Sequence, residues 1–179
     1  VAGINPVRLM TPSGPVIGTF AWNAASSVYE FTRTTAGAAI TLTRPVPMIT
    51  SGRDARRDDL ALIQIGRNNP SETEQVKEDI LAMIAALRPG SPRYLVIGLT
   101  TANSEPIGSD AHNAILALTA WQQRTFGRRF VNIYDYLMTY GLNDANIAPT
   151  TQDVADLEAG IIPTSLRSDN LHLNAAGQR

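Results

Sequence analysis

The residues of this chain best suited to acid–base chemistry lie close to its C-terminus. Asp169 stands three positions before His172 in a short polar run. At this spacing the carboxylate can hydrogen-bond the imidazole, hold it in one tautomer and stabilise its positive charge. Such a pair is the base-and-orienter half of a Ser-His-Asp hydrolase, in which His172 takes a proton from a serine and returns it to the leaving alcohol. The chain has one other histidine, His112, so the sequence predicts His172 as the catalytic base.

A second polar motif follows an apolar run in the middle of the chain. Residues 60–65 read Leu-Ala-Leu-Ile-Gln-Ile, and Gly66-Arg67-Asn68-Asn69 follow directly. A short apolar run bounded by Gly and Pro is typical of a buried strand in a parallel sheet. Open α/β sheets bind ligands just beyond the carboxyl ends of their strands. The sequence therefore predicts that the Asn68 amide donates to a developing oxyanion and that Gly66 permits the turn.

Together the two motifs resemble blocks of the SGNH (GDSL-type) hydrolases. That family carries a Gly-Asp-Ser nucleophile, a glycine donor, a Gly-x-Asn-Asp turn and a C-terminal Asp-x-x-His. Here Gly66 to Asn69 match the third block, with Asn in the last place, and Asp169 to His172 match the fourth. The resemblance covers residues 58–179. It implies a serine ester hydrolase without a cofactor, acting on acetyl or other short acyl esters, often on carbohydrates.

The chain departs from the family at the nucleophile. No Gly-Asp-Ser sequence occurs in it, and Ser13, Ser26 and Ser27 lie in turn-rich or strand-like sequence. We therefore expect the C-terminal portion of such a protein, with the nucleophilic serine supplied by an upstream segment or a second chain. The strand that bears this serine is central in the family's sheet. We accordingly expect the chain to fold stably only with that partner segment.

Other roles are open for the same residues. Asp169 could simply cap the last turn of the chain, and Asn68 could form an Asx-turn after the strand. Arg67 is a candidate ligand for a substrate carboxylate or sugar hydroxyl, although a surface role is the simpler interpretation. Asn69 is a neutral residue that can hydrogen-bond the loop or the substrate.

Composition excludes several other functions. The formal net charge is −1, and aspartates interrupt the basic cluster at 53–57, so we expect no nucleic-acid partner and no binding to a membrane. The absence of Cys excludes disulfides, thiolate metal sites and a cysteine nucleophile. Two histidines without a paired acidic cluster lack metal-ligand spacing, so we expect no metal. No apolar run approaches the length of a membrane span. An extracellular or virion-associated protein is favoured.

The composition and the residue patterns divide the chain into two regions. Residues 1–52 are rich in Thr, Val, Gly and Pro, with alternating runs at 28–34 and 39–43, which predicts a β-rich inserted element. This element would either shape substrate access or only cover a sheet edge. Residues 53–179 alternate strand-like and helix-like runs. They predict an SGNH-like α/β core, a three-layer α/β/α flavodoxin-like parallel sheet.

The elements of this core can be placed from their patterns. Strands are predicted at 60–65, 94–99 and 130–134, and residues 100–103 should reach the same crevice as Asn68. Ser71-x-x-Glu74 predicts a capping box that opens a helix through Leu87, with Pro89-Gly90 ending it. The apolar residues expected to face the sheet from this helix are Val76, Ile80, Met83, Ile84 and Leu87.

Two further helices are expected before the dyad. One runs from Asp110, its N-cap, to Phe126, with Gly127 as C-cap; a cation is disfavoured near its start, so we interpret His112 as structural. A short helix at 135–140 leads into an irregular loop through Ser168 that carries the Asp–His pair.

Two other hypotheses about the function are alternatives to the hydrolase. One is a non-catalytic SGNH-derived module that binds glycans or packs in a larger assembly. The missing Gly-Asp-Ser favours it, whereas the retained Asp169 and His172 oppose it. The other is a flavodoxin-like domain with coincidental motifs, which would need a phosphate loop that the sequence lacks.

Overall fold

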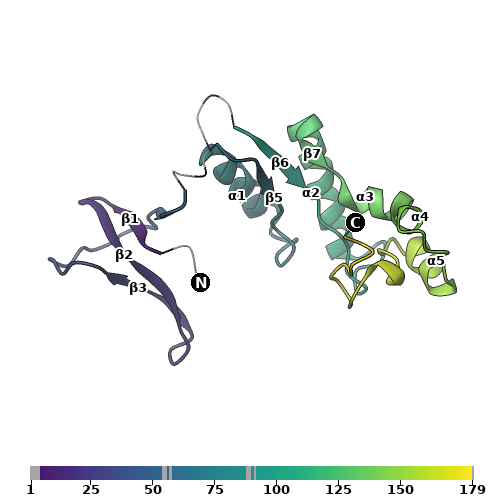
Figure 1. The fold of residues 1–179 in the computed structure, drawn as a ribbon, viewed down its shortest axis with the longest axis horizontal. Helices are drawn as coiled ribbons and strands as arrows, with labels where there is room; N and C mark the ends of the chain where they lie inside the picture. Colours follow the sequence, from purple (N-terminus) through teal and green to yellow (C-terminus); the bar gives the residue numbers. More distant parts are fainter. Residues whose placement is uncertain (1–4, 54–55, 57, 88–89, 91, 179) are drawn as a thin grey trace. The chain divides into compact units, whose positions relative to one another are not determined.

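A computed structural model describes residues 5–53, 56, 58–87, 90 and 92–178 of the chain. The chain divides into two compact units, Val1–Asp59 and Leu60–Arg179, which are drawn in Figure 1. The basic cluster at 53–57 and the predicted helix stop at Pro89 fall partly outside the described residues. Each unit is described by itself below.

The first unit is an antiparallel sheet with the strand order β3-β2-β1-β4. Its strands are β1 (Val7–Thr11), β2 (Gly14–Asn23), β3 (Val28–Arg33) and β4 (Met48–Thr50). A tight turn joins β1 to β2, and Gly14 there has a φ of 111°, which favours glycine. The predicted run at 28–34 forms β3, whereas the predicted run at 39–43 forms no strand.

This sheet has little core of its own. Among its described residues, only Val7 and Gly18 are buried. Phe20 and Tyr29 stack with ring centroids 5.1 Å apart, and Trp22 meets Tyr29 edge-on at 5.1 Å. These cross-strand aromatic contacts hold β2 and β3 together while leaving much ring surface exposed.

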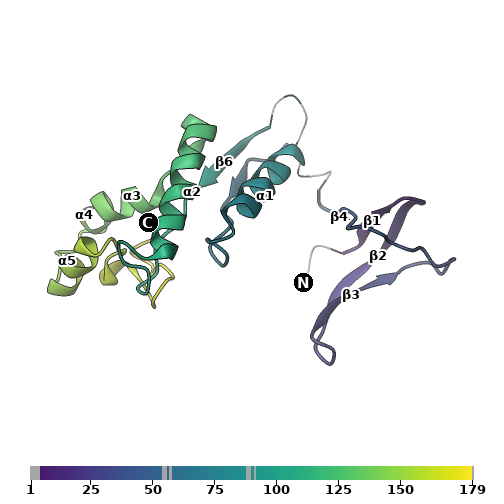
Figure 2. The same ribbon diagram turned by 180° about the vertical axis from the view of Figure 1, so that it is seen from behind.

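The second unit contains a parallel sheet with the strand order β5-β6-β7. Its strands are β5 (Ala61–Ile63), β6 (Tyr94–Ile97) and β7 (Phe130–Val131). Helices α1 (Thr73–Ala85) and α2 (Asp110–Phe126) connect them. One apolar core joins strands and helices, and Figure 2 shows α1 and α2 beside the strands from behind. The fully or nearly buried members of this core are Ile63, Val76, Ile80, Val96, Leu99, Ile115, Leu118 and Phe126.

The predicted three-layer α/β/α flavodoxin-like sheet is wrong. The structure has a four-stranded antiparallel sheet and a separate three-stranded parallel sheet. Both α1 and α2 pack on the side of the parallel sheet that carries Ile63 and Val96. On the opposite side, Leu62 is 62% exposed. Apolar runs predict strands correctly, but they do not show whether one or both faces of a sheet are covered.

Several boundaries differ from the predicted ones. The predicted capping box of α1 is absent, because its N-cap is Glu72 and no side chain caps it. The N-cap of α2 is Ser109 rather than Asp110, since the Ser109 hydroxyl accepts from the His112 N–H. Met83, expected to face the sheet, is exposed. Gly127 ends α2 as predicted.

The C-terminal part is more helical than predicted. The third predicted strand stops at Val131, because Asn132 caps the helix α3 (Ile133–Tyr136). A π-helical turn and the short helix α4 (Leu142–Asp144) follow. The predicted irregular loop contains α5 (Thr151–Glu158) and a 3₁₀ turn at Thr164–Leu166. A second apolar core formed by Leu137, Leu142, Ile162 and Leu166 holds this part together.

Over the described part of the chain, no helix combines the length and the apolar character that crossing a membrane requires.

Candidate functional site

Asp169 and His172 form a hydrogen-bonded pair in a loop after the 3₁₀ turn. Asp169 Oδ2 lies 2.8 Å from His172 Nδ1. The other carboxylate oxygen, Oδ1, accepts the backbone N–H groups of Leu171 (2.8 Å) and His172 (2.7 Å). One carboxylate therefore both shapes the loop and orients the ring. Nε2 of His172 is left without a hydrogen-bond partner among the described residues, as a proton-accepting atom requires.

The same contacts keep Asp169 ionised. The backbone N–H of His172, then that of Leu171, and then the His172 ring lower the pKa of Asp169 to about 2. The carboxylate therefore carries its charge throughout the neutral range. The ionised carboxylate, 2.8 Å from Nδ1, fixes the orientation of the ring.

Short backbone contacts close the loop around the pair. The Ser168 N–H donates to the His172 carbonyl at 2.8 Å, and Arg167 and Leu173 form an antiparallel bridge. The Asn103 N–H donates to the Asn170 carbonyl at 2.8 Å, which joins the loop to the segment after β6. The dyad is thus brought to the carboxyl end of the parallel sheet.

A pocket of about 410 Å³ opens at this end of the sheet. His172 and Asn68 both line it, so the structure brings the predicted base and the predicted oxyanion donor to one cavity. The Asn68 side chain is exposed and makes no hydrogen bond to the described residues, which leaves its amide available to a ligand. The other lining residues are Gln64, Arg67, Leu99, Thr100, Ile133, Leu171, Leu173 and Gln178.

Arg67 also lines the pocket, but its positive charge is paired with the carboxylate of Glu105. Its Nη2 donates to Glu105 Oε2 at 2.7 Å, and the two side chains are only 22% and 12% exposed. Glu105 Oε2 also accepts the Ala102 N–H at 2.7 Å, which holds it in place. The pocket wall is therefore electrically neutral at Arg67, and its other polar groups are amides, the Thr100 hydroxyl and the His172 ring.

Gly66 and Asn69, the other two residues of the motif, lie away from His172. They line a separate pocket against α1. The Asn69 amide donates to Glu72 Oε2 at 2.9 Å. Gly66 has a φ of 97°, and a Cβ there would come within 2.6 Å of Val76 Cγ1. Gly66 thus permits the turn and the close approach of α1.

Among the described residues that line the 410 Å³ pocket there is a hydroxyl, that of Thr100, but no serine. Thr100 follows β6, where the sequence predicts that residues reach the crevice. His112 is 2% exposed, its Nδ1 lies 3.2 Å from the Glu105 carbonyl, and it packs edge-on against Tyr134. Where residues are described, no three His, Cys, Asp or Glu side chains gather closely enough to hold a metal ion.

Two groups near the site were not predicted from the sequence. Glu105 lies in a loop and carries no motif that would reveal its pairing with Arg67. The second group is the pair of buried carboxylates of α5, Asp153 and Asp156. Thr150-x-x-Asp153 forms a capping box at the start of α5, so this pattern could have revealed the helix.

Comparison of the sequence with known proteins gives one distant relative. No family model matches the chain, and no solved structure matches it. The chain is 27% identical, over 178 residues, to the tail spike protein of Salmonella phage epsilon15. The match covers 89% of this chain but 16% of the tail spike protein, so the chain corresponds to a small part of that relative.

Proposed function

We propose that this chain carries the acid–base half of an SGNH-type serine ester hydrolase. His172 serves as the general base and then the general acid, Asp169 orients it, and the Asn68 amide donates to the tetrahedral oxyanion. The observation that carries the proposal is the Asp169–His172 hydrogen bond of 2.8 Å beside a cavity that Asn68 also lines. The two sequence motifs and this geometry support it; the three-layer fold that the resemblance implied is no part of it.

In this proposal the nucleophilic serine comes from polypeptide outside these 179 residues. Two features support a docking place for such a segment. The free edge of β5 has no strand partner among the described residues, and the sheet face that carries Leu62 is uncovered. A strand that added to this edge would end beside Gln64 and Asn68, at the mouth of the pocket.

The substrate class follows from the walls of the pocket. With Arg67 neutralised by Glu105, the exposed polar groups suit hydroxyls and carbonyls, while Leu99, Ile133 and Leu173 suit a short acyl chain. We propose an uncharged acetyl or short-chain ester, on a carbohydrate. The distant tail spike relative supports a virion-associated setting for the chain.

The second candidate is a non-catalytic module that binds glycans or packs in a larger assembly. The observation in its favour is that no serine lines the pocket among the described residues. Asp169 and His172 would then serve only to shape their loop.

Fluorophosphonate labelling followed by peptide mass spectrometry tests the proposal. It is applied to the 179-residue chain and to a longer protein in which this chain is joined to the proposed serine-bearing segment. Label on a serine outside these residues, lost in His172→Gln, is the expected result. Label on a serine within them would move the nucleophile into the chain. No label on either protein would favour the non-catalytic module.

A further inference from the structure

We propose that Arg167 is a positioning residue, which holds the Asp169–His172 pair in place by tying the main chain of Asp169 to Asp156, a buried carboxylate of α5. The importance of this positioning for catalysis rests on the proposed function, because the pair takes part in a reaction only if His172 acts as a base. The connection from Asp156 through Arg167 to Asp169, called the tether below, is a property of the folded chain and can be measured without a substrate.

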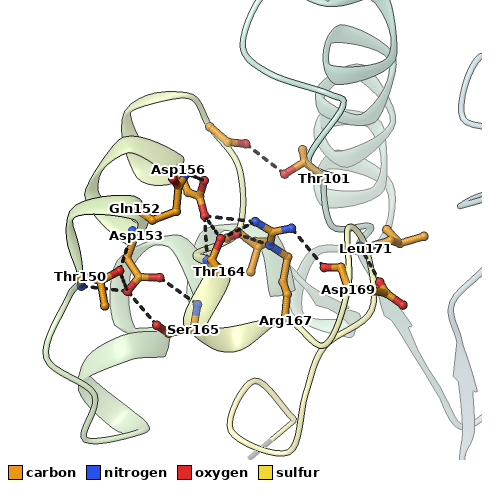
Figure 3. Close-up of polar contacts among 12 residues, drawn as sticks. Thr101, Thr150, Gln152, Asp153, Asp156, Thr164, Ser165, Arg167, Asp169 and Leu171 are labelled. Atoms are coloured by element: carbon orange, nitrogen blue, oxygen red, sulfur yellow. Dashed lines mark hydrogen bonds and ion pairs between the residues drawn. The ribbon is translucent and has the colours of Figure 1, made fainter.

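The guanidinium of Arg167 spans the space between α5 and the dyad loop, as Figure 3 shows. Its Nε donates to the Ile162 carbonyl at 2.7 Å, and its Nη2 donates to Asp156 Oδ2 at 3.1 Å and to Thr164 Oγ1 at 2.9 Å. Its Nη1 donates to the Asp169 carbonyl at 3.2 Å. The planar guanidinium spreads these donors over three nitrogen atoms in a fixed geometry, whereas a lysine carries all its donors on a single nitrogen and cannot span the same acceptors.

Asp156 is a rigid anchor for this fork. Its Oδ2 also accepts the Thr164 N–H (2.8 Å) and hydroxyl (2.6 Å), and its Oδ1 accepts the Gln152 amide (2.8 Å). Burial acts to raise the pKa of Asp156, but these hydrogen bonds and that from Arg167 outweigh it and lower the pKa. The carboxylate is therefore ionised and its oxygens are occupied, so it cannot move without losing several contacts.

The dyad loop needs such support because its own contacts are local. Every hydrogen bond that the exposed Asp169 carboxylate accepts comes from Leu171 or His172, in the same loop. The Asn103 N–H holds the loop at the Asn170 carbonyl. Arg167 holds it at the neighbouring Asp169 carbonyl. Loss of either support would let the carboxylate and the imidazole drift apart.

Stabilisation of the fold alone does not account for this arrangement. The side chains of Arg167 and Asp156 are 5% and 3% exposed. Removing two charges from water costs about as much as their pairing returns, so an apolar pair of similar volume would hold the two segments equally well. An apolar pair could not supply the hydrogen bonds to Ile162, Thr164 and Asp169, and of these only the bond from Nη1 to the Asp169 carbonyl reaches the dyad.

Three variants separate positioning from folding. Arg167→Lys keeps a positive charge near Asp156 but loses the fork. Arg167→Met removes the donors and leaves Asp156 unpaired. Asp156→Asn combined with Arg167→Met removes both buried charges while keeping the volume. The matched control is Asp153→Asn, because Asp153 is a buried carboxylate of the same helix that holds Ser165 and Thr150 and does not touch Arg167.

The measurement is the titration of the Asp169 carboxyl carbon by NMR, on folded protein verified by its amide spectrum. We expect the pKa of Asp169 to rise from about 2 toward the ordinary 3.8 in all three Arg167 variants, as the loop N–H groups lose their fixed geometry. In Asp153→Asn the melting temperature should fall while the pKa of Asp169 stays unchanged. If Arg167→Met does not fold, the positioning role is tested with Arg167→Lys and the double variant.

The outcomes distinguish the tether from the proposed function. An unchanged Asp169 titration in the folded Arg167 variants overturns the positioning role, whatever the labelling result. If the Asp169 titration shifts but the longer protein takes no fluorophosphonate label, the positioning role of Arg167 is supported and the hydrolase function is contradicted. With a labelled serine, Arg167→Lys should in addition lower kcat about tenfold and leave KM unchanged, since it acts through His172 and not on the substrate.

Discussion

At the scale of single residues, one carboxylate performs two tasks at this site. Asp169 builds its loop through two backbone N–H groups and orients His172 through the ring. The alternative role of Asp169 as a local cap is therefore compatible with its proposed role as the orienting acid. Because its pKa is about 2, its effect on His172 is constant at all pH values where an esterase would work.

Asn68→Ala tests the oxyanion role. Its amide is free and faces the pocket of His172, and loss of one oxyanion donor typically lowers kcat by about 10²–10³. We expect a loss of this size in ester hydrolysis by the longer protein. The matched control is Asn69→Ala, which removes an amide bonded to Glu72 and away from His172, so kcat should stay nearly unchanged. Full activity in Asn68→Ala would remove this residue from the mechanism.

Glu105→Gln tests the neutrality of the pocket. Glu105 cancels the charge of Arg67 at 2.7 Å, so its replacement leaves a net positive charge in the wall. An interaction of ~1 kcal/mol between unit charges in a water-exposed setting corresponds to about fivefold in rate or affinity. We expect the ratio of kcat/KM for a succinyl ester over an acetyl ester to rise by that factor. Glu158→Gln, at an exposed position of α5, should leave the ratio unchanged; an equal ratio in both variants would contradict the assignment.

At the scale of elements, α5 is the support of the C-terminal part. Its two buried carboxylates bind the 3₁₀ turn from two sides, Asp153 through Ser165 and Asp156 through Thr164. The 3₁₀ turn leads directly into the dyad loop. This segment was predicted to be part of an irregular loop, but it contains the helix that supports the dyad loop.

Asp153→Asn should weaken this support in a pH-dependent way. Burial acts to raise the pKa of Asp153, but hydrogen bonds from the backbone and hydroxyl groups of Ser165 and Thr150 outweigh it and hold the pKa at about 2. A depressed pKa stabilises the folded state above the ordinary value of 3.8, and this contribution disappears as the pH falls through 2. At pH 7 the free energy of unfolding should fall by roughly 2 kcal/mol in the variant.

Urea denaturation at pH 7, 4 and 2 measures this effect. The gap between the natural chain and Asp153→Asn should be largest at pH 7 and should close toward pH 2. A gap that is independent of pH would mean that the variant loses packing and not ionic hydrogen bonds.

At the scale of the whole molecule, the parallel sheet of the second unit is covered on one side. Leu62 is 62% exposed and Leu60 is 52% exposed, while Ile63 on the other side is 2% exposed. Exposed apolar faces next to an open strand edge are sites of association. The expectation that the chain folds stably only with a partner segment stays a prediction, and this face is where that segment would pack.

Leu62→Thr tests the open face. Threonine suits a strand and lowers the apolar area, so the 179-residue chain should self-associate less and keep its free energy of unfolding within about 0.5 kcal/mol. Ile63→Thr, one residue along the strand, should cost on the order of 2 kcal/mol because it buries a hydroxyl in the core. Sedimentation and urea denaturation give both quantities. Equal destabilisation by the two changes would show that the Leu62 face is covered within the chain.

The sequence alone was sufficient for features that depend on local spacing. The Asp–His interval predicted a hydrogen bond that the loop forms at 2.8 Å, since a spacing of three residues puts these side chains within reach of each other. Helical periodicity likewise located α1 and α2, although α1 lacks the predicted cap. The position of Asn68 after an apolar strand put it in the pocket of His172, because the carboxyl ends of parallel strands share one edge.

Only the tertiary structure decided what depends on contacts between distant segments. Burial patterns in sequence do not say which face of a sheet lacks a layer, so the three-layer fold was wrong. The pairing of Arg67 with Glu105 joins two loops, and the tether from Asp156 through Arg167 to Asp169 joins a helix to a loop. Side chains far apart in the chain meet only after the cores have packed, and no local pattern records which of them will do so.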